Sequence, residues 1–122
     1  MKNNLALNAY NQNNVQVESP QRLIEMLYEG ILRFNTQAKK AILDENIEKR
    51  VYWLNRSAGI FTELMNSLNL KAEGTTAAYL EGLYAYQLEQ ITQANMENSA
   101  EIIDKINVVV RGLLDAWREV NA

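Results

Sequence analysis

The 122-residue sequence contains no cysteine and no histidine. Without cysteine, neither a disulfide framework nor thiolate chemistry is available to the chain. Without histidine, the commonest general base and the commonest transition-metal ligand are both missing. We therefore expect a protein that is not an enzyme, with no catalytic residue, no metal site and no cofactor.

Glycine and proline are also scarce, with five glycines and a single proline, Pro20. The glycines are isolated from one another, so neither a GxGxxG nor a GxxxxGK phosphate-binding loop exists. Their positions are Gly30, Gly59, Gly74, Gly82 and Gly112. Nucleotide-dependent activity through either of these motifs is thereby excluded.

The chain lacks long apolar runs and concentrated basic charge. No apolar run approaches the roughly 20 residues that span a bilayer. Residues 1–17 are rich in Asn and Gln and have one Lys and no continuous apolar stretch, which is unlike a secretory signal and leaves the cytosol as the expected location. The net charge is −3, and no run of Lys and Arg stands out along the sequence, so we expect no nucleic-acid binding.

Apolar residues spaced three and four apart predict four helices. The first begins with Ser19 as N-cap and Pro20 at the first helical position, and extends to about Leu43. The second stripe alternates steps of four and three, which favours shallow packing angles between helices. In chain order the four stripes are Leu23, Leu27, Ile31, Phe34, Ala38 and Ala41; Ile47, Val51, Leu54, Ala58, Phe61, Met65 and Leu68; Ala77, Leu80, Tyr84, Leu88 and Ile91, with Leu83 and Ala94 beside them; and Ile102, Ile103, Ile106, Val109, Val110, Leu113, Leu114 and Trp117.

Short polar breaks separate these stripes, at residues 44–46, 69–74 and 95–99, and Ser99 is a candidate N-cap. Short connections place consecutive helices side by side and antiparallel. The sequence thus predicts an all-α fold, an antiparallel up-down-up-down four-helix bundle of residues 19–122. Residues 1–18 are expected to form a short, mobile N-terminal capping segment. The interior is expected to be apolar apart from the Tyr84 hydroxyl.

Carboxylates provide little sign of chemistry. A di-iron site in a helical bundle needs Glu-x-x-His motifs, which this chain cannot form. Two carboxylate pairs, Glu25 with Glu29 and Glu97 with Glu101, fall on faces that we expect to be solvated. Burial that would raise the pKa of a general acid is not expected there. Ser19 and Ser99 are interpreted as helix caps rather than nucleophiles.

Three rows of apolar residues remain outside the stripes and predict an external groove. A row taken alone has an equally good explanation, because a bundle helix with two neighbours needs a wide apolar arc. Three rows together favour a surface that receives an amphipathic helix, and aromatic side chains are typical of such surfaces. The predicted groove residues are Ile24, Tyr28, Leu32, Trp53, Ile60, Leu64, Tyr79 and Tyr86. Changing Trp53 or Tyr28 to Glu is expected to weaken partner binding with little loss of helicity.

An open apolar groove favours aggregation, so something should cover it before a partner arrives. The N-terminal segment is the candidate cover, through Leu7, Tyr10, Val15 and Val17.

Several short segments resemble one known family, and the match runs from about Ala9 to Val120. They are Ala9-Tyr10, Val17-Glu18-Ser19-Pro20 followed by Leu23, Met26-Leu27-Tyr28-Glu29-Gly30, Phe34 and Ala38, Leu64 to Leu70 before Glu73-Gly74, Leu83-Tyr84, Ala94-Asn95, and Leu113-Leu114-Asp115-Ala116-Trp117. Together these segments resemble the FliS family of flagellar secretion chaperones. The chain departs from the family at Glu73-Gly74-Thr75, where a Gly-Gly pair is common.

The resemblance implies a specific function. FliS-like proteins are helical bundles that bind the disordered C-terminal segment of flagellin in the cytosol, prevent its premature polymerisation and assist type III export. An N-terminal segment caps part of the client site, which corresponds here to Leu5 to Val17. A component of the flagellar export gate and other flagellar regulators would be further partners, with no membrane insertion, and the chain would be a monomer or weak dimer. The alternative is a structural helical bundle that homodimerises through its external apolar groove.

Overall fold

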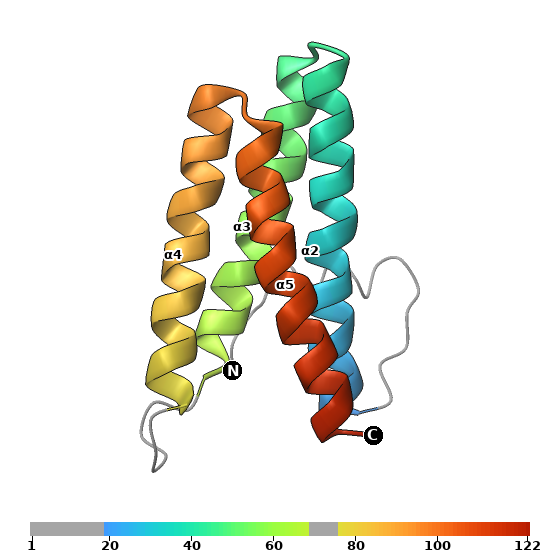
Figure 1. The fold of residues 1–122 in the computed structure, drawn as a ribbon, viewed down its shortest axis with the longest axis vertical. Helices are drawn as coiled ribbons and strands as arrows, with labels where there is room; N and C mark the ends of the chain where they lie inside the picture. Colours follow the sequence, from blue (N-terminus) through green and yellow to red (C-terminus); the bar gives the residue numbers. More distant parts are fainter. Residues whose placement is uncertain (1–18, 69–75) are drawn as a thin grey trace.

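The computed structural model describes residues 19–68 and 76–122, which form four α-helices (Figure 1). These are α2 (Pro20–Leu43), α3 (Ile47–Asn66), α4 (Thr76–Glu97) and α5 (Ala100–Val120). α2 packs against α3 and α5, and α4 packs against the same two helices, so each helix has two neighbours. The predicted four-helix bundle is confirmed. The predicted capping segment, residues 1–18 with Leu7, Tyr10, Val15 and Val17, lies outside the described residues.

Side-chain caps define where three of the helices begin. The Ser19 hydroxyl accepts a hydrogen bond from the Arg22 amide at 3.1 Å, and Pro20 occupies the first turn. Asn46 caps α3 by accepting from the Lys49 amide at 3.0 Å. Ser99 caps α5 by accepting from the Ile102 amide at 3.1 Å. The predicted caps Ser19 and Ser99 are therefore confirmed, and the cap of α3, Asn46, lies within the predicted break at residues 44–46.

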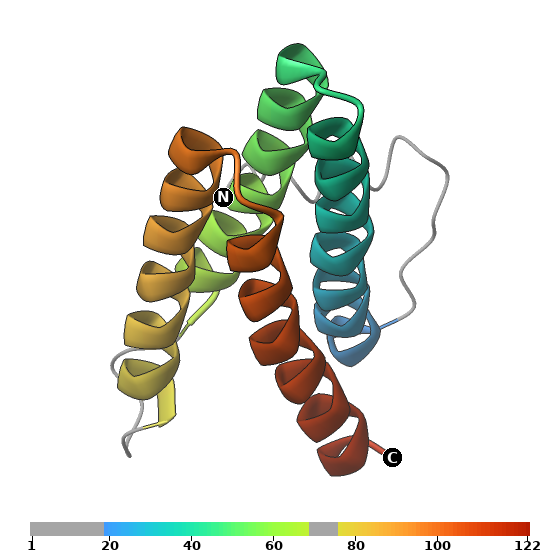
Figure 2. The ribbon, with the colours of Figure 1, turned by 45° about the horizontal axis from the view of Figure 1, so that its top comes forward.

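The α2–α3 and α4–α5 connections share one geometry. Each contains a residue with positive φ, Glu45 (57°) and Asn98 (54°). The next amide, of Asn46 or Ser99, donates back to a carbonyl five residues earlier, at 2.9 and 3.0 Å. This arrangement ends one helix and presents the N-cap of the next within three residues. Both connections lie at the same end of the bundle, and the α2–α3 connection projects further (Figures 1 and 2).

The hydrophobic core fills the space between the four helices and uses members of every predicted stripe. Its largest fully buried apolar side chains come from α2, α3 and α5, and include Leu27, Ile31, Leu54, Phe61 and Ile103. Phe61 packs against Tyr84 of α4, with ring centroids 6.2 Å apart. Burial of these apolar side chains is the main favourable contribution to folding.

The interior also holds a polar network, so the expectation of an interior apolar except for Tyr84 is wrong. Asn35 of α2 donates to the side-chain oxygen of Asn107 of α5 at 2.8 Å. Ser57 of α3 donates to the side-chain oxygen of Asn35. These three side chains are almost fully buried, as are Gln87 and Glu63. Buried polar groups that satisfy one another oppose sliding of the helices, and we infer that this network fixes their register.

Ion pairs join the end of α5 to the start of α2. Arg118 contacts Glu25 and Glu29, each at 2.6 Å, and Arg22 contacts Glu25 at 2.9 Å. The Trp117 indole N–H donates to the Gln21 carbonyl at 2.9 Å. Glu25 and Glu29 are therefore partly exposed partners of α5, rather than a merely solvated face.

Replacing Glu25 by Gln should lower the melting temperature at neutral pH but not in acid. Hydrogen bonds from Arg118 and then Arg22 hold the pKa of Glu25 below its ordinary value of 4.5. A lowered pKa in the folded state stabilises the fold above pH 4.5, and this contribution is lost as the pH falls through the folded-state pKa. Thermal melts of both proteins at neutral pH and near pH 2 measure the effect. An equal difference at both pH values would contradict it.

Candidate protein-binding surface

Helix α4 carries apolar side chains around most of its circumference but buries only a narrow face. Its fully buried residues are Tyr84, Gln87, Ile91 and Ala94. Tyr79 and Tyr86 lie outside that face and are 67% and 54% exposed, and Leu83 between them is half-buried. These three residues are spaced i, i+4 and i+7, so they form one row along the helix.

The row lies on the flank of α4 nearer α5. Asn95 lines a hollow with Val51 and Ala58 of α3, which places Asn95 on the α3 flank. Tyr86 precedes Asn95 by nine residues, which is about two and a half turns of an α-helix, so the two side chains point in opposite directions from the helix axis. Tyr86 is therefore on the opposite flank.

On α5, Val109 precedes Arg118 by nine residues, and Arg118 forms an ion pair with Glu25 of α2. Val109 therefore faces away from α2 and toward α4. Val109 and Leu113 are half-buried. We call Tyr79, Leu83, Tyr86, Val109 and Leu113 the α4–α5 face.

Three predicted groove residues are instead in the core, and their placement on an open groove is wrong. Tyr28, Ile60 and Leu64 are 3%, 1% and 1% exposed. The reason is that α2 and α3 each pack against two other helices, so each needs an apolar arc wide enough for both contacts. The rows that were predicted to line a groove supply the second part of that arc. The hydroxyls of Tyr28 and Tyr84 are 2.6 Å apart, and burial raises the pKa of both phenols, so both remain neutral.

Ile24 and Leu32 are half-buried against the core. Leu32 lies seven residues from both Glu25 and Lys39, which pair with Arg118 and Asp104 of α5. Positions seven apart share a helix flank, so Leu32 lies at the α2–α5 contact rather than on an open surface.

Trp53 lies on a different side of the bundle from the two α4 tyrosines. Its ring is 5.5 Å from that of Phe34 and 4.8 Å from that of Tyr52. The Arg56 guanidinium lies over the Phe34 ring at 4.7 Å. The predicted rows therefore do not converge on one groove: Tyr79 and Tyr86 belong to the α4–α5 face, and Trp53 belongs to the α2–α3 side. Sequence reasoning missed Arg56, because its contact with Phe34 joins two helices and has no local signature.

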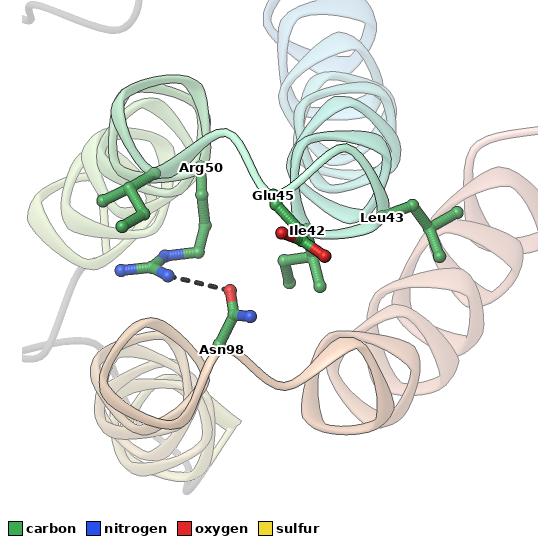
Figure 3. A pocket seen from close by; sticks show the side chains of 6 residues that line it. Ile42, Leu43, Glu45, Arg50 and Asn98 are labelled. Carbon is green, nitrogen blue, oxygen red and sulfur yellow. Dashed lines mark hydrogen bonds between the residues drawn. The ribbon is translucent and has the colours of Figure 1, made fainter.

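Two adjoining open hollows, which share Arg50, lie toward the end of the bundle with the short connections. The larger, about 540 Å³, is lined by Ile42, Leu43, Glu45, Ile47, Arg50 and Asn98. Arg50 donates to the side-chain oxygen of Asn98, in the α4–α5 connection, at 2.8 Å (Figure 3). It also donates to the side-chain oxygen of Asn95 of α4 at 2.8 Å, and so bridges α3 to α4 and to the α4–α5 connection. The second, about 410 Å³, shares Arg50 and continues between α3 and α4. Leu43 and Ile47 remain 82% and 64% exposed at this end.

Residues 19–68 and 76–122 contain neither a membrane-spanning helix nor a cluster of metal-ligating side chains. No helix there is both long and apolar enough to cross a bilayer. Nor do three or more acidic side chains converge in those ranges so as to hold a metal ion. The described surface does present exposed apolar and aromatic side chains, Tyr79 and Tyr86 among them.

Comparison with known proteins identifies the family. The family model described as flagellar protein FliS matches residues 1–122. The flagellar secretion chaperone FliS of Campylobacter jejuni is 53% identical over 121 residues, covering 99% of this chain and 94% of the relative. The protein of the same name from Bacillus subtilis is 32% identical over 111 residues, covering 91% and 82%. This chain belongs to the FliS family of flagellar secretion chaperones.

Proposed function

We propose that this protein is a flagellin-specific export chaperone. It binds the disordered C-terminal segment of flagellin in the cytosol, prevents premature polymerisation and assists flagellar type III export. A component of the export gate and other flagellar regulators are further proposed partners. Membership of the FliS family supports the proposal, and the exposed tyrosines of the α4–α5 face supply a surface for it.

The observation that carries the proposal is the row Tyr79, Leu83 and Tyr86 on a helix that buries only four residues. Large aromatic side chains provide much contact area for little loss of side-chain entropy, and Tyr is enriched among residues that dominate binding energy. A disordered client loses conformational entropy when it orders, so its contact must be long. A row along a helix meets that requirement better than a compact pocket.

We further propose that residues 1–17 cover apolar surface until the client binds. Deleting these residues should increase binding of a hydrophobic dye by the free protein, or its self-association, because exposed apolar patches attract one another. Dye fluorescence and light scattering of the deletion variant and the full chain provide the measurement. Unchanged values of both would argue against a covering role.

Seeded polymerisation of purified flagellin tests the proposed function directly. Filament growth followed by light scattering should stop when the chain is present at a one-to-one ratio with flagellin. Molar masses from multi-angle light scattering should then show a complex of one chain and one flagellin. Uninhibited growth, with a chain dimer that the flagellin C-terminal peptide leaves unchanged, would favour the homodimerising structural bundle.

A further inference from the structure

The outer side of the α2–α3 pair combines aromatic rings with basic charge. Tyr52 and Trp53 contact one another, with Tyr52 51% exposed, and Arg56 stacks beside them. Lys40 of α2 and Lys49 of α3 are exposed and line the same hollow as Trp53. We call Lys40, Lys49, Tyr52, Trp53 and Arg56 the α2–α3 face. Its basic residues are scattered along the sequence, and only the packing of α2 on α3 brings them together.

The hollow in this face has a volume of about 150 Å³ and is lined by Gln37, Lys40, Ala41, Asp44, Lys49 and Trp53. Small-molecule sites usually measure roughly 300–1,000 Å³. A space of this size, with Ala41 and the Trp53 ring as apolar walls, suits one aliphatic side chain. Lys40 and Lys49 stand at its rim, with Asp44 the one acidic residue in its lining.

The positive charges of this face lack acidic partners within the described part of the chain. The ion pairs found there involve other basic residues, namely Arg22, Lys39 and Arg118. The Arg56 guanidinium donates to the Tyr52 hydroxyl at 3.3 Å, while its buried Nε has no hydrogen-bond partner among these residues. A guanidinium prefers two parallel hydrogen bonds to a carboxylate. In a chain of net charge −3, the three basic residues of this face outnumber Asp44 of its hollow, and the buried Nε of Arg56 is left without a hydrogen-bond partner among the described residues.

Helix stability does not explain the position of Lys49. Asn46 is the N-cap of α3, so Lys49 lies in the first turn, where the helix dipole disfavours positive charge. A Glu at this position would instead favour the dipole and could complete a capping box. A residue that is unfavourable for its own helix and exposed at a basic hollow points to a role in binding.

We propose that the α2–α3 face is a second interaction surface, which binds an acidic helical segment of a partner protein. An aliphatic side chain of that segment enters the hollow beside Trp53, and its carboxylates meet Arg56, Lys40 and Lys49. Charge complementarity selects the partner, because the basic side chains of this face have no carboxylate partner among the described residues and an acidic segment would supply carboxylates to them. This surface is separate from the α4–α5 face, so the inference does not rest on the proposed binding of flagellin.

The probe is a synthetic amphipathic helix with Leu at i, i+4 and i+7 flanked by Glu, compared with the same peptide carrying Gln for Glu. Fluorescence anisotropy with the full-length chain should show about tenfold tighter binding of the Glu peptide, and this difference should shrink as salt is added. Lys49→Glu should weaken binding of the Glu peptide about tenfold. The same change should raise the melting temperature by about 2–4 °C. A purely structural role for Lys49 would not produce these opposite effects.

Two further variants sharpen the test. Arg56→Lys keeps the charge but loses the planar guanidinium, and should also weaken binding of the Glu peptide. Arg111→Glu on α5 makes the same charge change as Lys49→Glu at an exposed position outside this face, and should leave the affinity unchanged. Equal affinities for the Glu and Gln peptides would overturn the proposal, as would equal losses in Lys49→Glu and Arg111→Glu. An oligonucleotide of matched charge that bound equally tightly would show a general polyanion surface instead.

Discussion

The Tyr28→Glu variant should lose about 4 kcal/mol or more of the free energy of unfolding. Tyr28 is 3% exposed and its hydroxyl bonds to that of Tyr84. A glutamate here would place a carboxylate in the core without a cationic partner, and would leave the Tyr84 hydroxyl beside it. Domains of this size have a total stability of about 5–15 kcal/mol, so this loss should remove a large fraction of it and shift the urea midpoint far below that of the wild-type chain. Urea denaturation followed by circular dichroism measures the loss.

The control for this variant is Tyr28→Phe, which keeps the ring and removes the hydroxyl. Its expected cost is about 1–2 kcal/mol, because one buried hydrogen bond is lost and the Tyr84 hydroxyl remains unpaired. A Tyr28→Glu protein that melts near the wild-type temperature and has lost only partner binding would restore the sequence-based placement of Tyr28 in an external groove.

Replacing Tyr79 and Tyr86 together by Glu should weaken binding of the flagellin C-terminal peptide by about 100-fold or more. Both side chains are more than half exposed on α4, so the fold should tolerate the change. The two introduced charges would have to be desolvated beneath an apolar client, and the aromatic contact area would be lost. Calorimetric titration gives the affinity, and circular dichroism checks that helical content is retained.

A matched control adds the same two charges elsewhere, as Thr62→Glu on α3 with Val108→Glu on α5, both at exposed positions outside the α4–α5 face. The control should bind as the wild-type chain does. If both double variants bound the peptide with wild-type affinity, the client would have to dock on another face.

Local signals in the sequence predicted the four helices and their packing into a bundle. They did not predict which apolar side chains would remain exposed on its surface. Ser19, Asn46 and Ser99 mark helix starts through contacts within four residues, so their effect could be read along the chain. Whether an apolar row is covered depends on which helices become neighbours. Tyr28 and Tyr86 have the same side chain, but Tyr28 points into the bundle and its hydroxyl bonds to that of Tyr84 of α4, whereas Tyr86 is 54% exposed. No local pattern in the sequence distinguishes the two.

Interactions between distant parts of the chain were missed for the same reason. Asn35 and Asn107 are 72 positions apart, and each alone is compatible with an exposed polar site. Lys40, Lys49 and Arg56 are scattered among acidic and apolar residues, so the sequence showed no basic cluster. The packing of α2 on α3 gathers these cations around Trp53.

Calorimetric titration of the flagellin C-terminal segment into the wild-type chain, at several temperatures, tests the central claim most directly. A disordered segment that orders on an apolar surface should bind one-to-one, with a favourable enthalpy and a negative heat-capacity change. Absence of any binding heat across the temperature range, with no complex seen by light scattering, would contradict the claim that this chain is a flagellin chaperone.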